Sequence, residues 1–437
     1  MEYKSFTLAN FKKIPQLRDH LSEEEIFDIE VVGHVFPFKV NNFLIEKSID
    51  WDNYKNDPIF NIVFPNRGML YEDEYEKVAS LLRKNASRDD LLKTVNEIRW
   101  NHNPHPAGQL DKNVPEIDGH KLAGSQHKYR ETILFFPRQG QTCHAYCSFC
   151  FRWPQFIGID SLKFASKEVD VLIEYIRRHT TITDILFTGG DPLIMRTNVL
   201  RRYIEPILEA KKNGIIPHLR TIRFGTKSVL YWPYRYLTDP DAEDLLNLFK
   251  EIREAGLHLT LPLHINHWKE LVPKETQLAI ERILSTGAIL RSQSPLMRHI
   301  NDNSQDWAKK WQMEVELNII PYYMFMARDT GAQHYFGVPI VEAWQIFRNA
   351  YNRVSGIART VRGPSMSATP GKVLINGVVE INGNKYISLQ FIQGRNPDWV
   401  GRPFFAQYDE KALWLDELKP AFADKFFFEA ETEKVSK

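Results

Sequence analysis

Cysteine is almost absent from this sequence, since the 437 residues contain only three. All three thiols fall in one short segment, at Cys143, Cys147 and Cys150. Cysteines used for packing would be scattered among apolar segments, and a disulfide framework needs an even count and an oxidising compartment. A structural zinc needs a fourth ligand, but His144 directly follows Cys143 and is badly placed to complete the same tetrahedron. The clustering therefore predicts that the three thiols bind one ligand together.

An excess of charge is also missing, because 56 Lys and Arg residues stand against 55 Asp and Glu residues. The balance implies no bulk attraction to nucleic acid or to an anionic membrane. No apolar run approaches the ~18 residues that a membrane span needs. The sequence from Met1 to His20 has no apolar core of signal-peptide length. With reduced thiols, these absences lead us to expect a cytoplasmic protein that binds neither nucleic acid nor membrane.

The C-x3-C-x2-C spacing of the three thiols suits an iron–sulfur cluster. Three thiolates can bind three irons of a [4Fe–4S] cluster and leave the fourth iron open to a small molecule. A protein that only carries electrons would supply a fourth ligand from its own chain. The sequence therefore predicts an open [4Fe–4S] site held by Cys143, Cys147 and Cys150.

From Glu131 onward, the sequence alternates between apolar runs and segments of helical periodicity. The runs that predict buried strands are Thr132–Phe136, Asp184–Phe187, Leu219–Phe224, His258–Ile265, Ala288–Leu296 and Ile319–Met326. The helical segments are Ser166–Thr180, Asp241–Gly256, Pro273–Gly287, Ser304–Leu317 and Val341–Gly356. Six strand–helix units are too few to close an eight-unit barrel, so we expect an α/β fold with a partial (βα)6 TIM-like barrel. In such folds the loops after the strands carry the chemistry, and the cysteines follow the first strand.

The chain divides into three predicted regions. Residues 1–125 are expected to form a helical N-terminal cap, with helices in Glu72–Arg99 broken near Asn85–Ser87. Residues 126–360 form the partial barrel, and residues 361–437 form a small β-rich C-terminal extension. In that extension, two Asn-Gly pairs (376–377 and 382–383) lie between β-prone runs and predict hairpins.

A Gly-Gly-Asp sequence ends the second predicted strand, at Gly189, Gly190 and Asp191. Glycine lets a ligand approach the backbone closely, and the carboxylate could accept from an amino group. Alone, these residues also fit an ordinary turn. Together with the cysteine motif, and with the aromatic Phe149 before the last cysteine, they resemble the radical S-adenosylmethionine superfamily.

Further motifs resemble the lysine 2,3-aminomutase family within that superfamily. The resemblance spans roughly residues 95–375 and is carried by residues 143–152, 188–193, 264–267, 293–302 and 321–323. It implies a partial barrel that holds the cluster, S-adenosylmethionine and pyridoxal phosphate. It also implies reductive cleavage to a 5′-deoxyadenosyl radical, abstraction of a β-hydrogen, and migration of the amino group from carbon 2 to carbon 3.

The resemblance assigns a role to individual residues near the cluster. The open iron would bind the amine and carboxylate of S-adenosylmethionine. The residues implied to bind this cofactor are Phe149, Gly189, Gly190, Asp191, His264 and Gln293. The Gly-Gly-Asp segment would receive the amine, whereas His264 and Gln293 would lie along the nucleoside. Taken alone, His264 also fits a histidine satisfied inside the core.

Two residues are implied to bind pyridoxal phosphate. Arg130, at the start of the first strand, resembles the arginine that contacts the phosphate, and Lys372 resembles the Schiff-base lysine. The family usually has a glycine-rich run before that lysine, whereas residues 365–370 read Ser-Met-Ser-Ala-Thr-Pro here. An exposed turn lysine is the alternative for Lys372.

Two arginines are implied to bind the substrate. Arg152 matches the arginine that grips the substrate carboxylate, and a guanidinium fork suits a carboxylate well. Arg328 stands where the lysine enzyme has an acidic residue for the distal ammonium, and a second such position falls near Arg362. Cations at these positions would favour a distal carboxylate, as in glutamate or aspartate. The alternatives are a surface charge for Arg152 and a salt bridge from Arg328 to Asp329. A one-residue slip in the match would also place the acidic Asp329 at the position of Arg328.

The leading hypothesis is therefore a radical aminomutase, an isomerase, acting on a free amino acid. A second hypothesis keeps the cluster and S-adenosylmethionine but has no pyridoxal phosphate and starts another reaction by hydrogen abstraction. The third is a non-catalytic iron–sulfur protein. The enzyme hypotheses imply an electron donor such as flavodoxin or ferredoxin and are compatible with a homo-oligomer. Since the chain lacks the extra cysteines of lysine 2,3-aminomutase proper, we expect no zinc between subunits.

Overall fold

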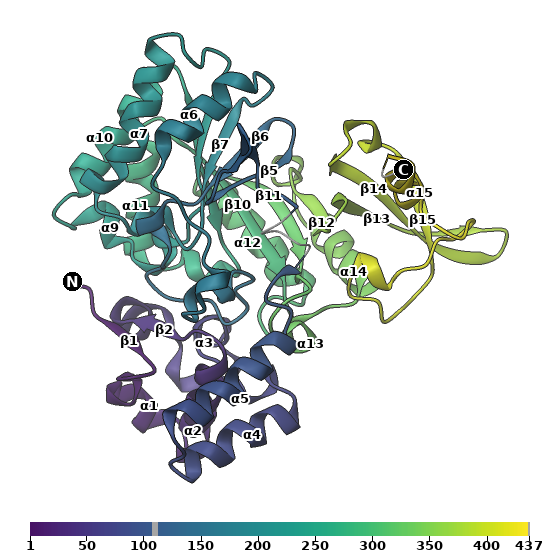
Figure 1. Cartoon of the computed structure of the whole chain (residues 1–437). Coiled ribbons are helices and arrows are strands. Elements are labelled where there is room, and N and C mark those ends of the chain that lie inside the picture. The colour runs from purple at the N-terminus through teal and green to yellow at the C-terminus, as the bar shows by residue number, and fades with distance from the viewer. Residues whose placement is uncertain (107–111, 436–437) are drawn as a thin grey trace.

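One sheet of eleven strands organises the computed structural model, which describes residues 1–106 and 112–435 (Figure 1). Its order is β15-β14-β13-β12-β11-β10-β9-β8-β7-β6-β5. The strands β6 to β12 are parallel: β6 (Thr132–Phe135), β7 (Asp184–Phe187), β8 (Thr221–Phe224), β9 (His258–His264), β10 (Ile289–Leu296), β11 (Ile319–Met326) and β12 (Arg362–Ser367). The fold is therefore α/β around a large, mainly parallel sheet.

The parallel strands follow one another in chain order without reversal. Successive connections therefore add strands in a single direction, which is the order of barrel-type sheets and not of doubly wound ones. The helices of these connections are α6 (Val169–Arg178), α7 (Thr197–Lys212), α8 (Ser228–Tyr231), α9 (Tyr234–Leu237), α10 (Ala242–Glu254), α11 (Lys274–Leu284), α12 (Ser304–Glu316), α13 (Gln333–Phe336) and α14 (Ile340–Tyr351).

The six predicted strands are confirmed to within two residues at each end. Several elements of the sheet and its connections were not predicted, among them the short helices α8, α9 and α13. A longer one is α7, which carries Pro206 in its interior, a residue that ordinarily breaks a helical pattern. Another is β12, a seventh parallel strand, which extends the sheet beyond the six predicted units.

The amino-terminal region contains both helices and short strands. Its helices are α1 (Pro15–His20), α2 (Glu23–Val35), α3 (Pro58–Val63), α4 (Glu72–Arg83) and α5 (Arg88–Asn101). The last two confirm the predicted break. The short strands β1 (Ser5–Thr7) and β2 (Lys39–Asn41) pair antiparallel, as do β3 (Glu116–Ile117) and β4 (His120–Lys121). Strand β5 (Ser125–Tyr129) joins the main sheet beside β6.

Only one of the two Asn-Gly pairs makes a hairpin, so the prediction of a turn at the other is wrong. Asn382 and Gly383 connect β13 (Gly371–Ile381) to β14 (Asn384–Gly394), and both have positive φ, as a tight two-residue turn requires. Gly377 instead lies inside β13, where the register shifts. A side chain there would collide with the Trp344 ring of α14, because the ring lies 2.7 Å from the position of its Cβ. The remaining strand, β15 (Pro403–Gln407), pairs with β14.

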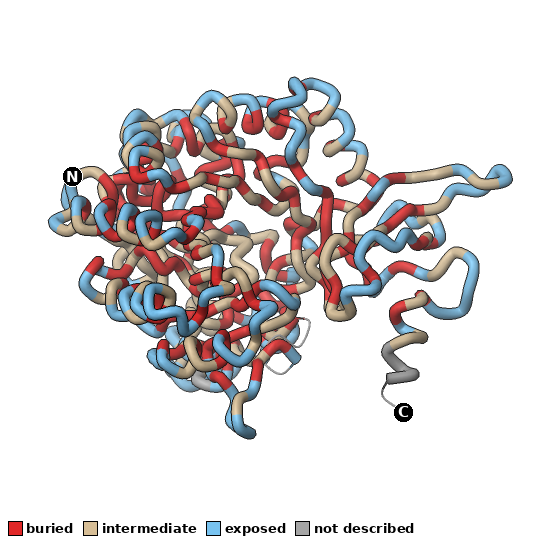
Figure 2. Tube along the Cα trace, turned by 90° about the horizontal axis from the view of Figure 1, so that it is seen from above, coloured by how far each residue is buried: buried red, intermediate tan, exposed pale blue. Residues whose placement is uncertain are grey.

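Two hydrophobic clusters support the sheet, and Figure 2 shows their buried residues inside an exposed outer layer. The larger cluster contains Phe11 and Ile98 of the amino-terminal region together with Ile133 of β6, so this region shares its core with the parallel strands. The smaller one gathers α12 and α14 with β13, β14 and the last helix, α15 (Phe427–Val435). Among the described helices, none is both long and apolar enough to cross a bilayer.

Candidate active site

Three of the loops that carry the predicted site leave the same edge of the sheet. The cysteine loop follows β6, Gly189 to Asp191 follow β7, and Arg328 follows β11. Because these strands are parallel, their carboxyl ends lie together, and this edge is where barrel folds place their chemistry. His264 is the last residue of β9, and its register partner Gln293 lies inside β10.

The three cysteines are free and partly exposed. Burial and the neighbouring negative charges raise the pKa of the Cys143 thiol, and burial together with Cys147 raises that of Cys150 to about 12. Such a site holds three thiolates only when a cation compensates them. Within the described ranges, no three His, Cys, Asp or Glu side chains converge on a point that would suit one metal ion. A cluster is compatible with three thiolates in one loop, since each thiolate would bind a different iron.

The two glycines hold the start of the cysteine loop against β7. A side chain on Gly190 would lie 2.4 Å from the Thr142 carbonyl oxygen, and one on Gly189 would meet the amide of Gln141. Gly189 also has a φ of 136°, which glycine alone tolerates easily. Their absent side chains therefore let the loop pack directly on the strand end.

Asp191 is buried and fully engaged by protein donors. Its oxygens accept hydrogen bonds from the backbone N–H groups of Leu193, Lys227 and Ser228 and from the Thr226 hydroxyl. In this structure the carboxylate thus caps the turn that leads into α8 and ties β7 to β8. The predicted role, acceptance of the methionine amine, would require it to give up one of these donors.

Residues of the amino-terminal region hold the cysteine loop through hydrogen bonds to its backbone carbonyl groups. The Lys39 ammonium donates to the Cys143 carbonyl oxygen over 2.8 Å, and the Tyr3 hydroxyl donates to that of His144 over 2.7 Å. The buried Asn41 amide donates to the carbonyl oxygens of His144 and Tyr231. Sequence reasoning missed these residues, because none of them carries a motif of its own.

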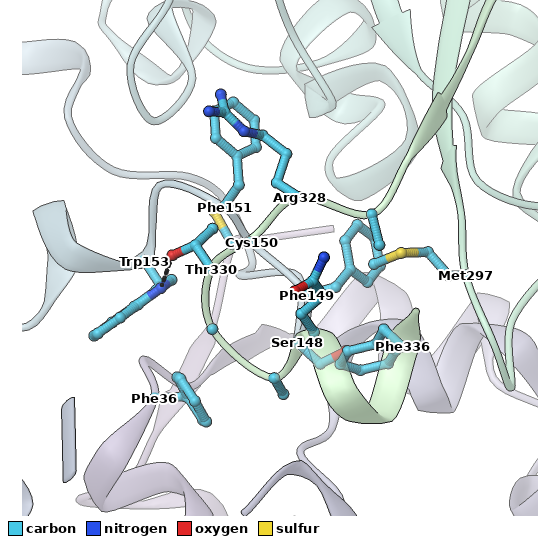
Figure 3. Close-up of a pocket in the computed structure, with 14 residues that line it drawn as sticks. Phe36, Ser148, Phe149, Cys150, Phe151, Trp153, Met297, Arg328, Thr330 and Phe336 are labelled. Carbon is cyan, nitrogen blue, oxygen red and sulfur yellow. Dashed lines mark hydrogen bonds between the residues drawn. The ribbon is translucent and has the colours of Figure 1, made fainter. Parts of the chain in front are cut away.

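A small pocket joins the cysteine loop to the end of β11. Cys150, Phe149 and Arg328 line it, and Figure 3 shows the Arg328 side chain extending past the Phe151 ring. The Phe149 ring lies 6.1 Å from that of His264, between their centroids. Burial, with Lys227 and Lys310 nearby, lowers the pKa of His264 well below its usual value, so this imidazole is neutral.

The guanidinium groups of Arg152 and Arg328 share the Phe151 ring. Their central carbons lie 4.9 Å and 5.4 Å from its centroid. Among the described atoms, Nη1 of Arg152 and Nε of Arg328 are buried and have no hydrogen-bond partner. Asp329 forms a long ion pair with Arg328, at 3.9 Å, so the alternative salt bridge is present, but this distance is too far for a hydrogen bond. Buried, unpaired guanidinium N–H groups suit an anionic ligand.

Three further cations complete what we call the cationic site, which consists of Lys128, Arg152, Arg328, Lys372 and Arg395. Burial, together with Arg395, Arg328 and Lys372, lowers the pKa of Lys128 to about 7. Burial, Arg223 and Arg362 lower that of Lys372, also to about 7. The Lys372 ammonium lies over the Tyr323 ring, 4.0 Å from its centroid.

Arg130 lies apart from this site. It is exposed in the turn between β5 and β6, at the amino end of β6, whereas the cysteine loop leaves the carboxyl end. Lys128, two residues earlier, reaches the site instead and donates to the Ala368 carbonyl oxygen. Sequence reasoning missed Lys128 and Arg395. The His-Lys-Tyr sequence before β6 was the available signal for Lys128.

Comparison with known proteins decides the family. A protein of Aquifex aeolicus, provisionally named L-lysine 2,3-aminomutase, is 30% identical over 407 residues, which cover 93% of this chain and 94% of that protein. The chain belongs to the lysine 2,3-aminomutase family of radical S-adenosylmethionine enzymes. The L-lysine 2,3-aminomutases of Haemophilus influenzae and Acetoanaerobium sticklandii are 27% and 26% identical, over 60% and 62% of this chain and 72% and 61% of theirs.

Membership of this family implies an enzyme with a [4Fe–4S] cluster and S-adenosylmethionine. No protein-family model matches the chain. Among solved structures, a radical S-adenosylmethionine methyltransferase from Kitasatospora setae aligns with 44% of this chain and 37% of its own, at a TM-score of 0.29 and 13% identity. That similarity is too low to support any conclusion about this fold.

Proposed function

We propose that this chain is a radical S-adenosylmethionine 2,3-aminomutase that uses pyridoxal phosphate and acts on a free amino acid with an acidic side chain. The observation that carries the proposal is the cationic site beside the three-thiol loop. The bound groups supply a 5′-deoxyadenosyl radical and the conjugated ring through which the amino group migrates. An electron donor such as flavodoxin or ferredoxin would feed the cluster.

The three regions of the chain would contribute differently to this activity. Residues 126–360, a partial barrel open on one side, would carry the cluster through Cys143, Cys147 and Cys150. Phe149 of that loop, His264 near its ring and Gln293, the register partner of His264, would line the nucleoside. Residues 1–125 would cover the loop and exclude water, and residues 361–437 would supply the lysine for pyridoxal phosphate.

Lys372 has the properties that carbonyl chemistry requires. A lysine reacts with an aldehyde as the neutral amine, and a pKa near 7 makes that form abundant at neutral pH. Its neighbours Tyr323 and Phe325 offer aromatic faces to a flat ring. An exposed turn lysine, the alternative, would not be shifted by burial. These observations support Lys372 as the residue that binds pyridoxal phosphate covalently.

The other cations match the anions of the proposed ligands. Lys128 and Arg395 lie near Lys372. Both cations would form ion pairs with the phosphate of the cofactor. Arg152 would bind the α-carboxylate of the substrate beside Cys150. Arg328 would bind a second carboxylate at the far end of the substrate, and it would repel an ammonium group at that position.

The test is an anaerobic assay of reconstituted enzyme with dithionite, S-adenosylmethionine and a panel of amino acids. We expect 5′-deoxyadenosine and β-isomers of glutamate or aspartate. The Cys147→Ser variant should form neither product. Release of 5′-deoxyadenosine without any amino-acid isomer would favour a radical enzyme that does not use pyridoxal phosphate. Turnover of lysine in place of the acidic amino acids would contradict the assignment of Arg328.

A further inference from the structure

Tyr231, at the end of α8, touches the cysteine loop through its hydroxyl group. The hydroxyl oxygen lies 2.9 Å from Sγ of Cys147, well within hydrogen-bonding distance for sulfur. The side chain is 2% exposed, so water does not compete for this contact. A thiolate carries no hydrogen, so in this contact the phenol can only donate.

The position of this hydroxyl is fixed by the residues around α8. Asp191 accepts from the backbone N–H groups of Lys227 and Ser228 and so holds the first turn of α8. At the other end, the Asn41 amide donates to the Tyr231 carbonyl oxygen over 2.8 Å. The Lys227 ammonium lies 4.9 Å from the centroid of the Tyr231 ring.

We propose that Tyr231 is a positioning residue that donates a hydrogen bond to the Cys147 ligand of the cluster and raises its reduction potential. The inference rests on the proposed function for the presence of the cluster. Reduction adds one electron from an external donor, and no bond to Tyr231 forms or breaks. The added charge is shared with the cysteinate sulfurs. A donor to one sulfur therefore stabilises the reduced form more than the oxidised form.

The test compares Tyr231→Phe with Tyr236→Phe in anaerobically reconstituted protein. Tyr236 is an equally buried tyrosine in α9, and its hydroxyl contacts that of Ser228 and no cysteine. The readout is the electron paramagnetic resonance signal of the reduced cluster during a redox titration without amino-acid substrate. For Tyr231→Phe, we expect the ratio of reduced to oxidised cluster at a fixed potential to fall about tenfold, which is about 59 mV. Tyr236→Phe should match the wild type.

An unchanged midpoint in Tyr231→Phe would overturn the proposal, and so would equal shifts in both variants. If Tyr231→Phe does not retain its cluster, 4-fluorophenylalanine at position 231 fills the volume of the hydroxyl without donating. Its midpoint should fall in the same way. Loss of the cluster from both replacements would also overturn the tuning role, because Tyr231 would then be required for assembly. A wild-type protein that binds no cluster would instead refute the proposed function.

Discussion

The Lys372 ammonium lies over the face of the Tyr323 ring, 4.0 Å from its centroid. The guanidinium groups of Arg223 and Arg362 are close enough to affect its charge. An aromatic face favours a cation, yet burial, Arg223 and Arg362 outweigh it and lower the pKa of Lys372 to about 7. Near neutral pH, the lowered pKa favours the neutral amine of this lysine, which faces an aromatic ring. On the proposed function, the C-terminal part of the chain would thus supply a nucleophile to the loops of the parallel strands.

The first prediction concerns the pH dependence of Lys372. Lowering its pKa makes the neutral amine the major form above pH 7, whereas an ordinary lysine reaches this point near 10.4. Trapping with pyridoxal phosphate and cyanoborohydride should therefore label Lys372 with a half-maximum near pH 7, as measured by peptide mass spectrometry. The exposed Lys385 serves as the internal control. A half-maximum for Lys372 close to that of Lys385 would contradict the prediction.

The second prediction concerns Arg328 and the acidic substrate. Arg328→Gln removes a charge-assisted pair worth about 1.5–3 kcal/mol, so kcat/KM for glutamate or aspartate should fall about 10- to 100-fold. Release of 5′-deoxyadenosine without substrate should persist, because the cluster is untouched. Arg402→Gln, at an exposed ion pair with Glu431, is the control and should be neutral. Equal losses in both variants would point to a general effect of charge.

The third prediction concerns the packing of Gly190 on the cysteine loop. In Gly190→Ala the methyl group would lie 2.4 Å from the Thr142 carbonyl oxygen, so the loop must shift. We expect a loss of about 1–3 kcal/mol in the free energy of unfolding and a lower iron content after reconstitution. Gly356→Ala is the matched control, since its methyl group would meet no atom within 4 Å. Full iron content in Gly190→Ala would show that the loop adapts.

The fourth prediction concerns Asn41, the link between the amino-terminal strands, the cysteine loop and α8. Asn41→Leu keeps the size of the side chain but leaves the carbonyl oxygens of His144 and Tyr231 without this donor. Unfolding in urea should show a loss of about 1–3 kcal/mol, and the cluster should be lost faster in air. Asn352→Leu, at an exposed position after α14, should change neither property. A cluster of unchanged lifetime would mean that this link is dispensable.

The strands of the parallel sheet were predictable because a strand buried on both faces appears in the sequence as a short apolar run. The rule failed for β12, whose six residues include Gly363 and Pro364. Helical periodicity in turn did not predict α7, where Pro206 interrupts the pattern. The Asn-Gly rule succeeded at Asn382 and failed at Asn376. A local turn signal cannot anticipate that Trp344 packs against the following glycine.

The sequence by itself determined that three thiols share one loop and that parallel strands bring this loop beside the Gly-Gly-Asp segment. Spacing along the chain is enough for both, since each depends on neighbouring residues or on one repeated unit. Only the tertiary structure decided that Lys128 and Arg395 join Lys372, that Arg130 does not, and that Asp191 caps α8 below Tyr231. These outcomes depend on which buried polar and charged groups interact across long separations in the chain. Local periodicity in the sequence does not encode such interactions.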